Sequence, residues 1–290
     1  MKLTYSKKLR LTGWLFILPS VLLVFVMSFY TISQAFLTSF QSGTGSRMTH
    51  AGLKNYARIL VDPTLRTAIG NTLIYMIQIP IMLGLALMLA VLVNDSSIRG
   101  RGIYRTLIFL PAVTSLASCS IIFLRLFAND GYLNTLLMQH GFIDRAIAFL
   151  SDRMGARLII VLVMTWRWTG VNMIYYLSGL QSIDESLYEA AAIDGATGFA
   201  RFRLITIPLL KPTILMTTIT STTGTLKLFD EVYNITGGGP ANATITLSQY
   251  LYQLCFKGVP QYGYASAIAY IIFLLAVLLA LLQMKAGDSK

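Results

Sequence analysis

The sequence predicts an all-α, polytopic membrane protein with six transmembrane helices and a cytoplasmic helical loop between the fourth and fifth helices. Of its 290 residues, 55% are hydrophobic and only 12% are charged, whereas soluble domains carry about 25% charged residues. The missing charges are replaced by long apolar runs. Because these runs are continuously apolar rather than alternating, they predict helices and not the strands of a membrane barrel.

Six apolar runs of roughly 20 residues divide the chain. At about 1.5 Å per residue, each run is long enough for the roughly 30 Å hydrocarbon layer. We predict an N-terminal segment 1–11, a six-span domain 12–285 and a tail 286–290. The predicted spans cover residues 14–36, 72–93, 106–124, 158–180, 205–226 and 264–284.

The basic residues predict the orientation of the spans. The chain opens with a basic segment, and Ser96–Arg105 is a second basic loop. Six spans place both termini on one side, and this charge bias indicates the cytoplasm. The bias is incomplete, since Arg47 and Arg66 fall in the first outer loop.

The net charge of +11 comes from basic residues that lie between the apolar runs. It therefore does not indicate a nucleic-acid partner. The first run is too long for a cleaved signal peptide.

Side chains that carry chemistry are sparse. Cys119 and Cys255 lie far apart without nearby metal-ligand residues, and we expect two free thiols. His50 and His140 fall in predicted loops. The sequence has no Gly-x4-Gly-Lys-Ser/Thr loop, so we predict no ATP site on this chain. We therefore expect no catalytic residue, no metal site and no cofactor here.

The loop at residues 181–204 does not have the composition of a simple connector. Ser186–Ile193 is rich in helix-forming residues, and the Asp194-Gly195 pair predicts a break after it. A second short helix is expected from Ala196, and Pro208 suits the first turn of the fifth span. We interpret the loop as a helical elbow under the membrane, suited to push against another protein.

A motif runs through this elbow. Glu189-Ala190-Ala191 is followed by three residues, Gly195, nine residues and Ile205-Thr206-Ile207-Pro208. This spacing resembles the motif of importer-type ABC permeases, with Ile207 in place of the usual leucine. Phe202 and the sequence Asp-Gly-Ala are similar to the version in carbohydrate-uptake permeases. The resemblance implies that the elbow couples to an ATPase, through Glu189, Ala190, Ala191, Asp194, Gly195, Ala196, Ile205 and Pro208.

The resemblance covers nearly the whole chain. Four other segments look like the carbohydrate-uptake subfamily: Gly52–Tyr56, Gly70–Thr72, Trp166–Gly170 and Thr236–Pro240. The last segment is similar to the first of two permease types, that of the larger maltose permease. This chain lacks that protein's extra N-terminal spans and large outer domain, and it resembles the minimal six-span version.

The resemblance implies a four-part importer in the bacterial inner membrane. Two different permeases form the pore through the lipid bilayer, and this chain would be one of them. Two ATP-binding cassette subunits hold ATP and Mg, and an extracytoplasmic solute-binding protein delivers a sugar or oligosaccharide. Acidic sugars, polyols and glycerol-phosphate compounds are alternative cargoes. A secondary active transporter is the alternative class. Such a transporter would tend to have acidic residues inside its spans and two similar halves, and this sequence shows neither feature.

Polar residues inside two spans predict the path of the cargo. Arg167 is ionisable within a span, which suggests a functional site, although a structural pair with Asp230 or Glu231 is the alternative. Trp168 would stack on a sugar ring or anchor at the membrane interface.

The fifth span has a hydroxyl-rich middle, and these hydroxyls would either meet cargo or bond to their own backbone and to other helices. At a period of 3.6, Ser221, Thr225 and Leu228 share one face beside Gly224. By resemblance, these positions coincide with the sugar-lining stretch of the maltose permease family. The predicted path consists of Arg167, Trp168, Val171, Ser221, Gly224, Thr225 and Leu228.

Overall fold

The computed structural model describes residues 5–44 and 47–288. Lys2 and the other residues before Tyr5 lie outside the described residues, as do the last two residues of the predicted tail. The chain forms two compact units. The first combines Met1–Asp62 with Leu251–Ile271, and the second combines Pro63–Tyr250 with Ile272–Lys290. The predicted all-α class is confirmed, because the described elements are helical apart from two strands of two residues each.

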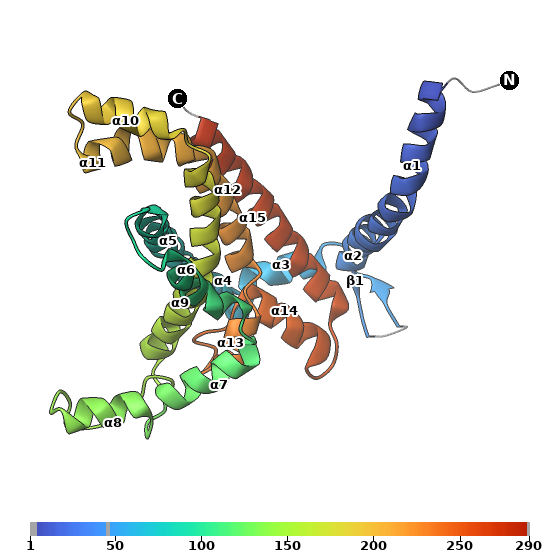
Figure 1. The fold of residues 1–290 in the computed structure, drawn as a ribbon. Helices are drawn as coiled ribbons and strands as arrows, with labels where there is room; N and C mark the ends of the chain where they lie inside the picture. Colours follow the sequence, from blue (N-terminus) through green and yellow to red (C-terminus); the bar gives the residue numbers. More distant parts are fainter. Residues whose placement is uncertain (1–4, 45–46, 289–290) are drawn as a thin grey trace. The chain divides into compact units, whose positions relative to one another are not determined.

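The first unit begins with one long helical rod (Figure 1). It consists of α1 (Tyr5–Val24), the π-helical segment η1 (Phe25–Tyr30) and α2 (Thr31–Ser39). Its most apolar window is not buried by any described residue. The rod therefore has an uncovered apolar surface that lipid or another subunit must cover.

A short loop region follows the rod in the first unit. Strand β1 (Gln41–Ser42) pairs antiparallel with β2 (Thr49–His50), and α3 (Lys54–Val61) follows. The unit is completed by the end of α14 (Leu247–Phe256) and the beginning of α15 (Tyr262–Asp288).

The second unit is a bundle around α9. Its helices are α4 (Pro63–Met76), α5 (Gln78–Asn94), α6 (Arg101–Val113), α7 (Leu116–Leu126), α8 (Tyr132–Gln139), α9 (Arg153–Gln181), α10 (Glu185–Ile193), α11 (Gly198–Arg201), the π-helical η2 (Phe202–Thr206), α12 (Ile207–Leu226) and α13 (Asp230–Ile235). Figure 1 shows α10, α11 and the end of α15 at one end of this unit, and α7, α8 and α13 at the other.

Small residues let the helices of this bundle approach closely. Ala86 and Ala90 of α5 are fully buried in one cluster with Met173 and Tyr176 of α9. On another face of α9, a Cβ at Gly170 would collide with the carbonyl oxygen of Ile108 in α6. Side chains of low volume at such contacts are typical of helix packing in membranes.

Five continuous helical stretches are long and apolar enough to cross a membrane, and a sixth is counted if one bent pair is a single span. The five are Leu9–Ser39, Pro63–Asn94, Arg153–Gln181, Gly198–Leu226 and Tyr262–Gly287. The predicted spans were shorter because they followed the apolar runs, whereas the helices extend beyond these runs.

The prediction of one continuous helix over residues 106–124 was wrong. That run is broken into α6 and α7, which meet at an angle of 93°. Thr114 and Ser115 adopt extended ψ angles of 140° and 128° at the break. Pro111 lies one turn earlier and lacks the backbone N–H that a continuous helix would use.

Candidate functional site

A cavity of about 440 Å³ lies inside the second unit, between α5, α7, α9, α12 and the segment that follows α12. The residues that line it are Gln78, Met82, Leu116, Met164, Arg167, Trp168, Val171, Asn172, Tyr175, Thr220, Ser221, Gly224, Thr225, Lys227, Leu228, Phe229, Asp230 and Glu231. All seven residues of the predicted cargo path are among them. The structure thus brings together residues that lie some 60 positions apart in the sequence.

The α9 wall carries an unusual arginine. The Nε and Nη1 atoms of Arg167 are buried and have no hydrogen-bond partner among the described residues. Its guanidinium carbon lies 5.6 Å from the centre of the Trp168 ring, within the range of a cation–π contact. Buried donors of this kind normally have a partner, so the cavity retains an unused capacity to donate hydrogen bonds.

The acidic residues at the cavity do not neutralise this arginine by direct contact. Glu231 is buried, and its Oε1 accepts a hydrogen bond of 3.1 Å from Trp168 Nε1. Within the described part of the chain, neither Asp230 nor Glu231 forms an ion pair with Arg167. The structural pair considered as the alternative role of Arg167 is therefore not formed in this conformation.

The threonine hydroxyls of α12 bond to the backbone of their own helix. Six threonines each donate to the carbonyl oxygen four residues earlier, at 2.7–2.9 Å: Thr217, Thr218, Thr220, Thr222, Thr223 and Thr225. This is the back-bonding alternative raised by the sequence. A hydroxyl that donates to its own helix still has lone pairs that accept. Thr220 and Thr225 therefore present acceptors to the cavity.

Two amide side chains that the sequence reasoning missed also line the cavity. Gln78 of α5 is buried; its Nε2 lies 3.5 Å from Thr225 Oγ1, and its Oε1 has no partner among the described residues. Asn172 of α9 donates to the Trp168 carbonyl at 2.9 Å. Gln78 could have been identified from the sequence, because it is a polar amide within an otherwise apolar run. The cavity therefore combines unused donors, acceptors and an aromatic face.

The elbow begins and ends with specific caps. The Asp184 carboxylate accepts the Ser186 backbone N–H at 3.0 Å at the start of α10, and this hydrogen bond lowers the pKa of Asp184. At the other end, Ala196 N–H donates to Ala191 O at 2.8 Å and Gly195 N–H donates to Ala192 O at 3.1 Å. This pair of bonds is a Schellman motif.

Gly195 is the turning point of the elbow. Its φ of +77° lies in the left-handed region, and a Cβ at this position would meet nothing within 4 Å. The requirement for glycine is thus one of backbone conformation and not of space. The second helix begins at Gly198 with Thr197 as its N-cap, not at Ala196 as predicted, because Ala196 is still part of the Schellman turn.

The rest of the motif lies on the exposed side of the unit. Glu189 and Ala190 are exposed on α10, Ile205 lies in η2, and Pro208 is in the first turn of α12. Tyr188 OH shares a hydrogen bond of 2.9 Å with Thr206 Oγ1 and so ties α10 to η2. Three apolar side chains of the elbow are 70–87% exposed: Ile193, Phe199 and Leu204. Such a surface suits contact with another protein.

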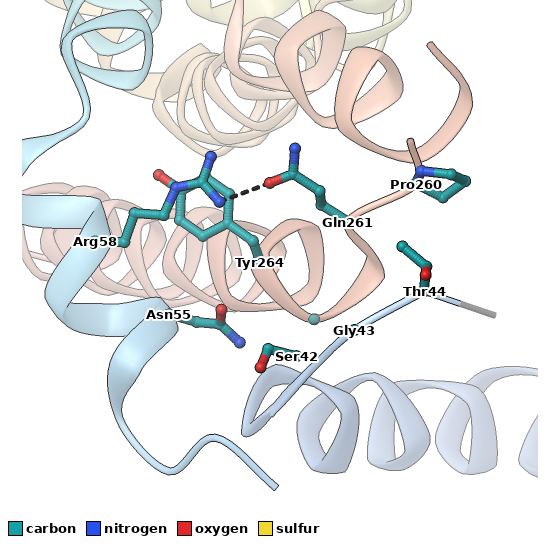
Figure 2. Close-up of a pocket in the computed structure, with 9 residues that line it drawn as sticks. Ser42, Gly43, Thr44, Asn55, Arg58, Pro260, Gln261 and Tyr264 are labelled. Carbon is teal, nitrogen blue, oxygen red and sulfur yellow. Dashed lines mark hydrogen bonds between the residues drawn. The ribbon is translucent and has the colours of Figure 1, made fainter. Parts of the chain in front are cut away.

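A smaller cavity of about 170 Å³ lies in the first unit (Figure 2). Arg58 Nη1 donates to Gln261 Oε1 at 2.6 Å, and the guanidinium lies 3.9 Å from the centre of the Tyr264 ring. These contacts link α3 to the beginning of α15 across the cavity. Among the described residues, no cluster of three His, Cys, Asp or Glu side chains could hold a metal ion.

A bundle of long apolar helices around a largely apolar cavity with a few polar groups is an arrangement typical of multi-span membrane transport proteins. Residues 82–286 match the family of binding-protein-dependent transport system inner membrane components. The chain belongs to this family, and the identification as an ABC-importer permease is confirmed.

Two relatives and one solved structure place the chain more closely. It is 46% identical to the lactose transport system permease protein LacF of Rhizobium radiobacter, over 96% of this chain and 94% of that protein. It is 33% identical to the arabinooligosaccharides transport system permease protein AraP of Halalkalibacterium halodurans, over 98% and 92%. A bacterial ABC transporter for import of the acidic polysaccharide alginate has a similar fold, with a TM-score of 0.86, 21% identity and 98% of each chain covered.

Proposed function

We propose that this permease moves a sugar or short oligosaccharide through the cavity between α9 and α12. The observation that carries the proposal is the convergence of Arg167, Trp168, Val171, Ser221, Gly224, Thr225 and Leu228 on one cavity. Its volume of about 440 Å³ falls within the range of roughly 300–1,000 Å³ that is typical of small-molecule sites. The relatives named for lactose and arabinooligosaccharides support a carbohydrate cargo.

The chemistry of the walls suits a sugar. A sugar hydroxyl both donates and accepts, and it can donate to Thr220. A side-chain rotation that turns the buried nitrogens of Arg167 or Gln78 Oε1 into the cavity would supply further partners. The ring of Trp168, which is 40% exposed, offers a flat apolar face.

An acidic sugar is the second candidate cargo. It is favoured by the unpartnered guanidinium of Arg167 and by Lys227, which lines the same cavity. Asp230 and Glu231 balance this charge and favour a neutral sugar. Competition between unlabelled lactose and a uronic-acid disaccharide for uptake distinguishes the two.

The proposed complex contains a second permease, two ATP-binding cassette subunits and an extracytoplasmic solute-binding protein. The elbow would fit the ATPase, because its exposed Ile193 and Phe199 need an apolar groove. ATP and Mg would be held by the ATPase subunits and not by this chain. The uncovered first helical rod is suited to the second permease or to lipid.

The proposed orientation places both termini, and the elbow with them, in the cytoplasm of the inner membrane. The elbow and the end of α15 lie at the same end of the second unit (Figure 1), which supports one side for both. Gly131–Asp152 would then face outward. A cysteine at Gln139 should react with an impermeant reagent in intact spheroplasts, whereas one at Asp184 should not; the reverse pattern would overturn the orientation.

The decisive test of the function is uptake by the assembled importer. Proteoliposomes with this chain, its partner permease, the ATPase subunits and the binding protein should accumulate labelled lactose or arabinooligosaccharide only with ATP. Uptake that persists without the ATPase subunits would favour a secondary active transporter instead. Absence of uptake for every sugar, polyol and glycerol-phosphate compound offered would reject the proposed cargo class.

A further inference from the structure

Helix α3 presents an apolar face that no described residue covers. Leu53, Leu60 and Val61 are 68%, 76% and 74% exposed. They occur at positions i, i+7 and i+8, with Ala57 between them, and therefore form one stripe along the helix. The opposite face is packed, since Asn55 is buried.

One end of α3 is fixed to the end of the first candidate span. Asn55 Nδ2 donates to Ser39 O at 2.7 Å and to Gln41 O at 2.8 Å. The hydroxyls of Ser39 and Tyr56 share another hydrogen bond of 2.7 Å. Because Ser39 is the last residue of that candidate span, α3 starts beside the end of the span.

The other end of α3 is fixed to the beginning of the last candidate span. Arg58 bonds to Gln261 and covers the ring of Tyr264 (Figure 2). Tyr264 OH in turn donates to Asp62 Oδ2 at 2.6 Å. The span starts at Tyr262. Helix α3 is therefore held beside the end of one candidate span and the beginning of another.

We propose that α3 lies in the membrane interface and binds anionic phospholipid. Leu53, Leu60 and Val61 would enter the acyl boundary, and Lys54, which is exposed along one edge of the stripe, would meet the phosphates, while Arg58 stays bonded to Gln261. Apolar and basic residues combined in this way are typical of helices that lie in the plane of the interface, and long basic side chains can extend to the headgroups. The binding would hold the first span at a fixed depth.

The test uses the full chain in nanodiscs of phosphatidylcholine, with or without phosphatidylglycerol. An environment-sensitive fluorophore is attached at Leu60→Cys or Val61→Cys, after Cys119→Ala and Cys255→Ser. Leu22→Cys, in the first span, and Asp144→Cys, in an exposed loop, are the lipid and water references. We expect blue-shifted emission at positions 60 and 61, with quenching by lipid that carries a doxyl group near the glycerol backbone and little quenching by iodide.

The charge is tested with Lys54→Glu in the background of the labelled protein. Lipid quenching should fall in discs with phosphatidylglycerol and stay unchanged in phosphatidylcholine. Arg47→Glu, an exposed basic residue of the same loop outside α3, should have no effect in either. Iodide quenching at positions 60 and 61 as strong as at position 144 would overturn the proposal. So would protection that appears only when the solute-binding protein is added, since α3 would then be a protein-docking surface.

Discussion

The cavity and the elbow belong to the same unit, but they differ in whether their polar groups have hydrogen-bond partners. In the cavity, Arg167 Nε and Nη1 and Gln78 Oε1 are buried without partners among the described residues. In the elbow, Asp184 caps the start of α10 and a Schellman turn closes its end. The elbow instead exposes apolar side chains such as Ile193.

The difference indicates what each region lacks. A buried polar group without a partner costs about 1–3 kcal/mol, so the cavity is stabilised by water or by a polar ligand that supplies the missing hydrogen bonds. In the elbow, both ends of α10 have hydrogen-bond partners and apolar side chains are exposed. Such a surface is suited to a protein partner. One region is thus fitted for a solute and the other for a subunit.

The largest expected effect is at the turn of the elbow. Gly195→Val forces a β-branched residue into a φ of +77°, and Glu189→Lys reverses an exposed charge that we expect to pair with the ATPase. Both variants should insert and assemble but lose ATP-driven uptake, because hydrolysis is uncoupled from transport. Gly195→Asn is the matched control, since asparagine tolerates this conformation. Normal uptake by both variants would show that the elbow does not transmit the energy.

The next largest effect concerns the unpartnered arginine. Arg167→Ala should lower the apparent affinity for cargo about 10- to 150-fold, because a hydrogen bond to a charged group contributes about 1.5–3 kcal/mol. Assembly and ATPase activity stimulated by the loaded binding protein should stay near normal. If the complex is lost instead, and exchanging the charges of Arg167 and Glu231 restores it, the arginine is structural in another conformation.

The smallest effect is expected at the cap of α10. Hydrogen bonds from Ser186 lower the pKa of Asp184, so its stabilisation is complete above the unfolded pKa of about 3.9 and is lost as the pH falls through the lower folded value. A spin label at Ala192 should become more mobile in acid. Asp184→Asn, which keeps a capping oxygen, should remove this pH dependence; equal dependence in both proteins would contradict the assignment.

The sequence identified the cavity face of α12 because that face follows from helical period alone. Ser221 and Thr225 must share a side of any regular helix, and Arg167 stood out as the charge within an apolar run. Leu228 was assigned to the same face by this period, but α12 ends at Leu226. The contributions of α5 and the residues after α12 could not be derived in this way. They depend on which helices pack together, as in the hydrogen bond between Trp168 and Glu231.

Local breaks were harder to foresee than spans. An apolar run specifies burial in lipid but not continuity, so residues 106–124 looked like one helix although Thr114 and Ser115 interrupt it. Pro111 in this run indicated that the helix could be interrupted. The start of α11 was also displaced, because the Schellman turn after Gly195 uses Ala196 before a new helix can begin.

The central claim, that cargo passes along the cavity face of α12, is tested most directly by cysteine protection in the assembled importer. Ser221→Cys and Gly224→Cys lie on the cavity, whereas Thr223→Cys lies on the same helix outside its lining. A small hydrophilic thiol reagent should modify positions 221 and 224 during turnover, and transported sugar should slow that reaction without changing the rate at position 223. Reaction at 221 and 224 that is unaffected by sugar, or that occurs only with a lipid-soluble reagent, would contradict the account.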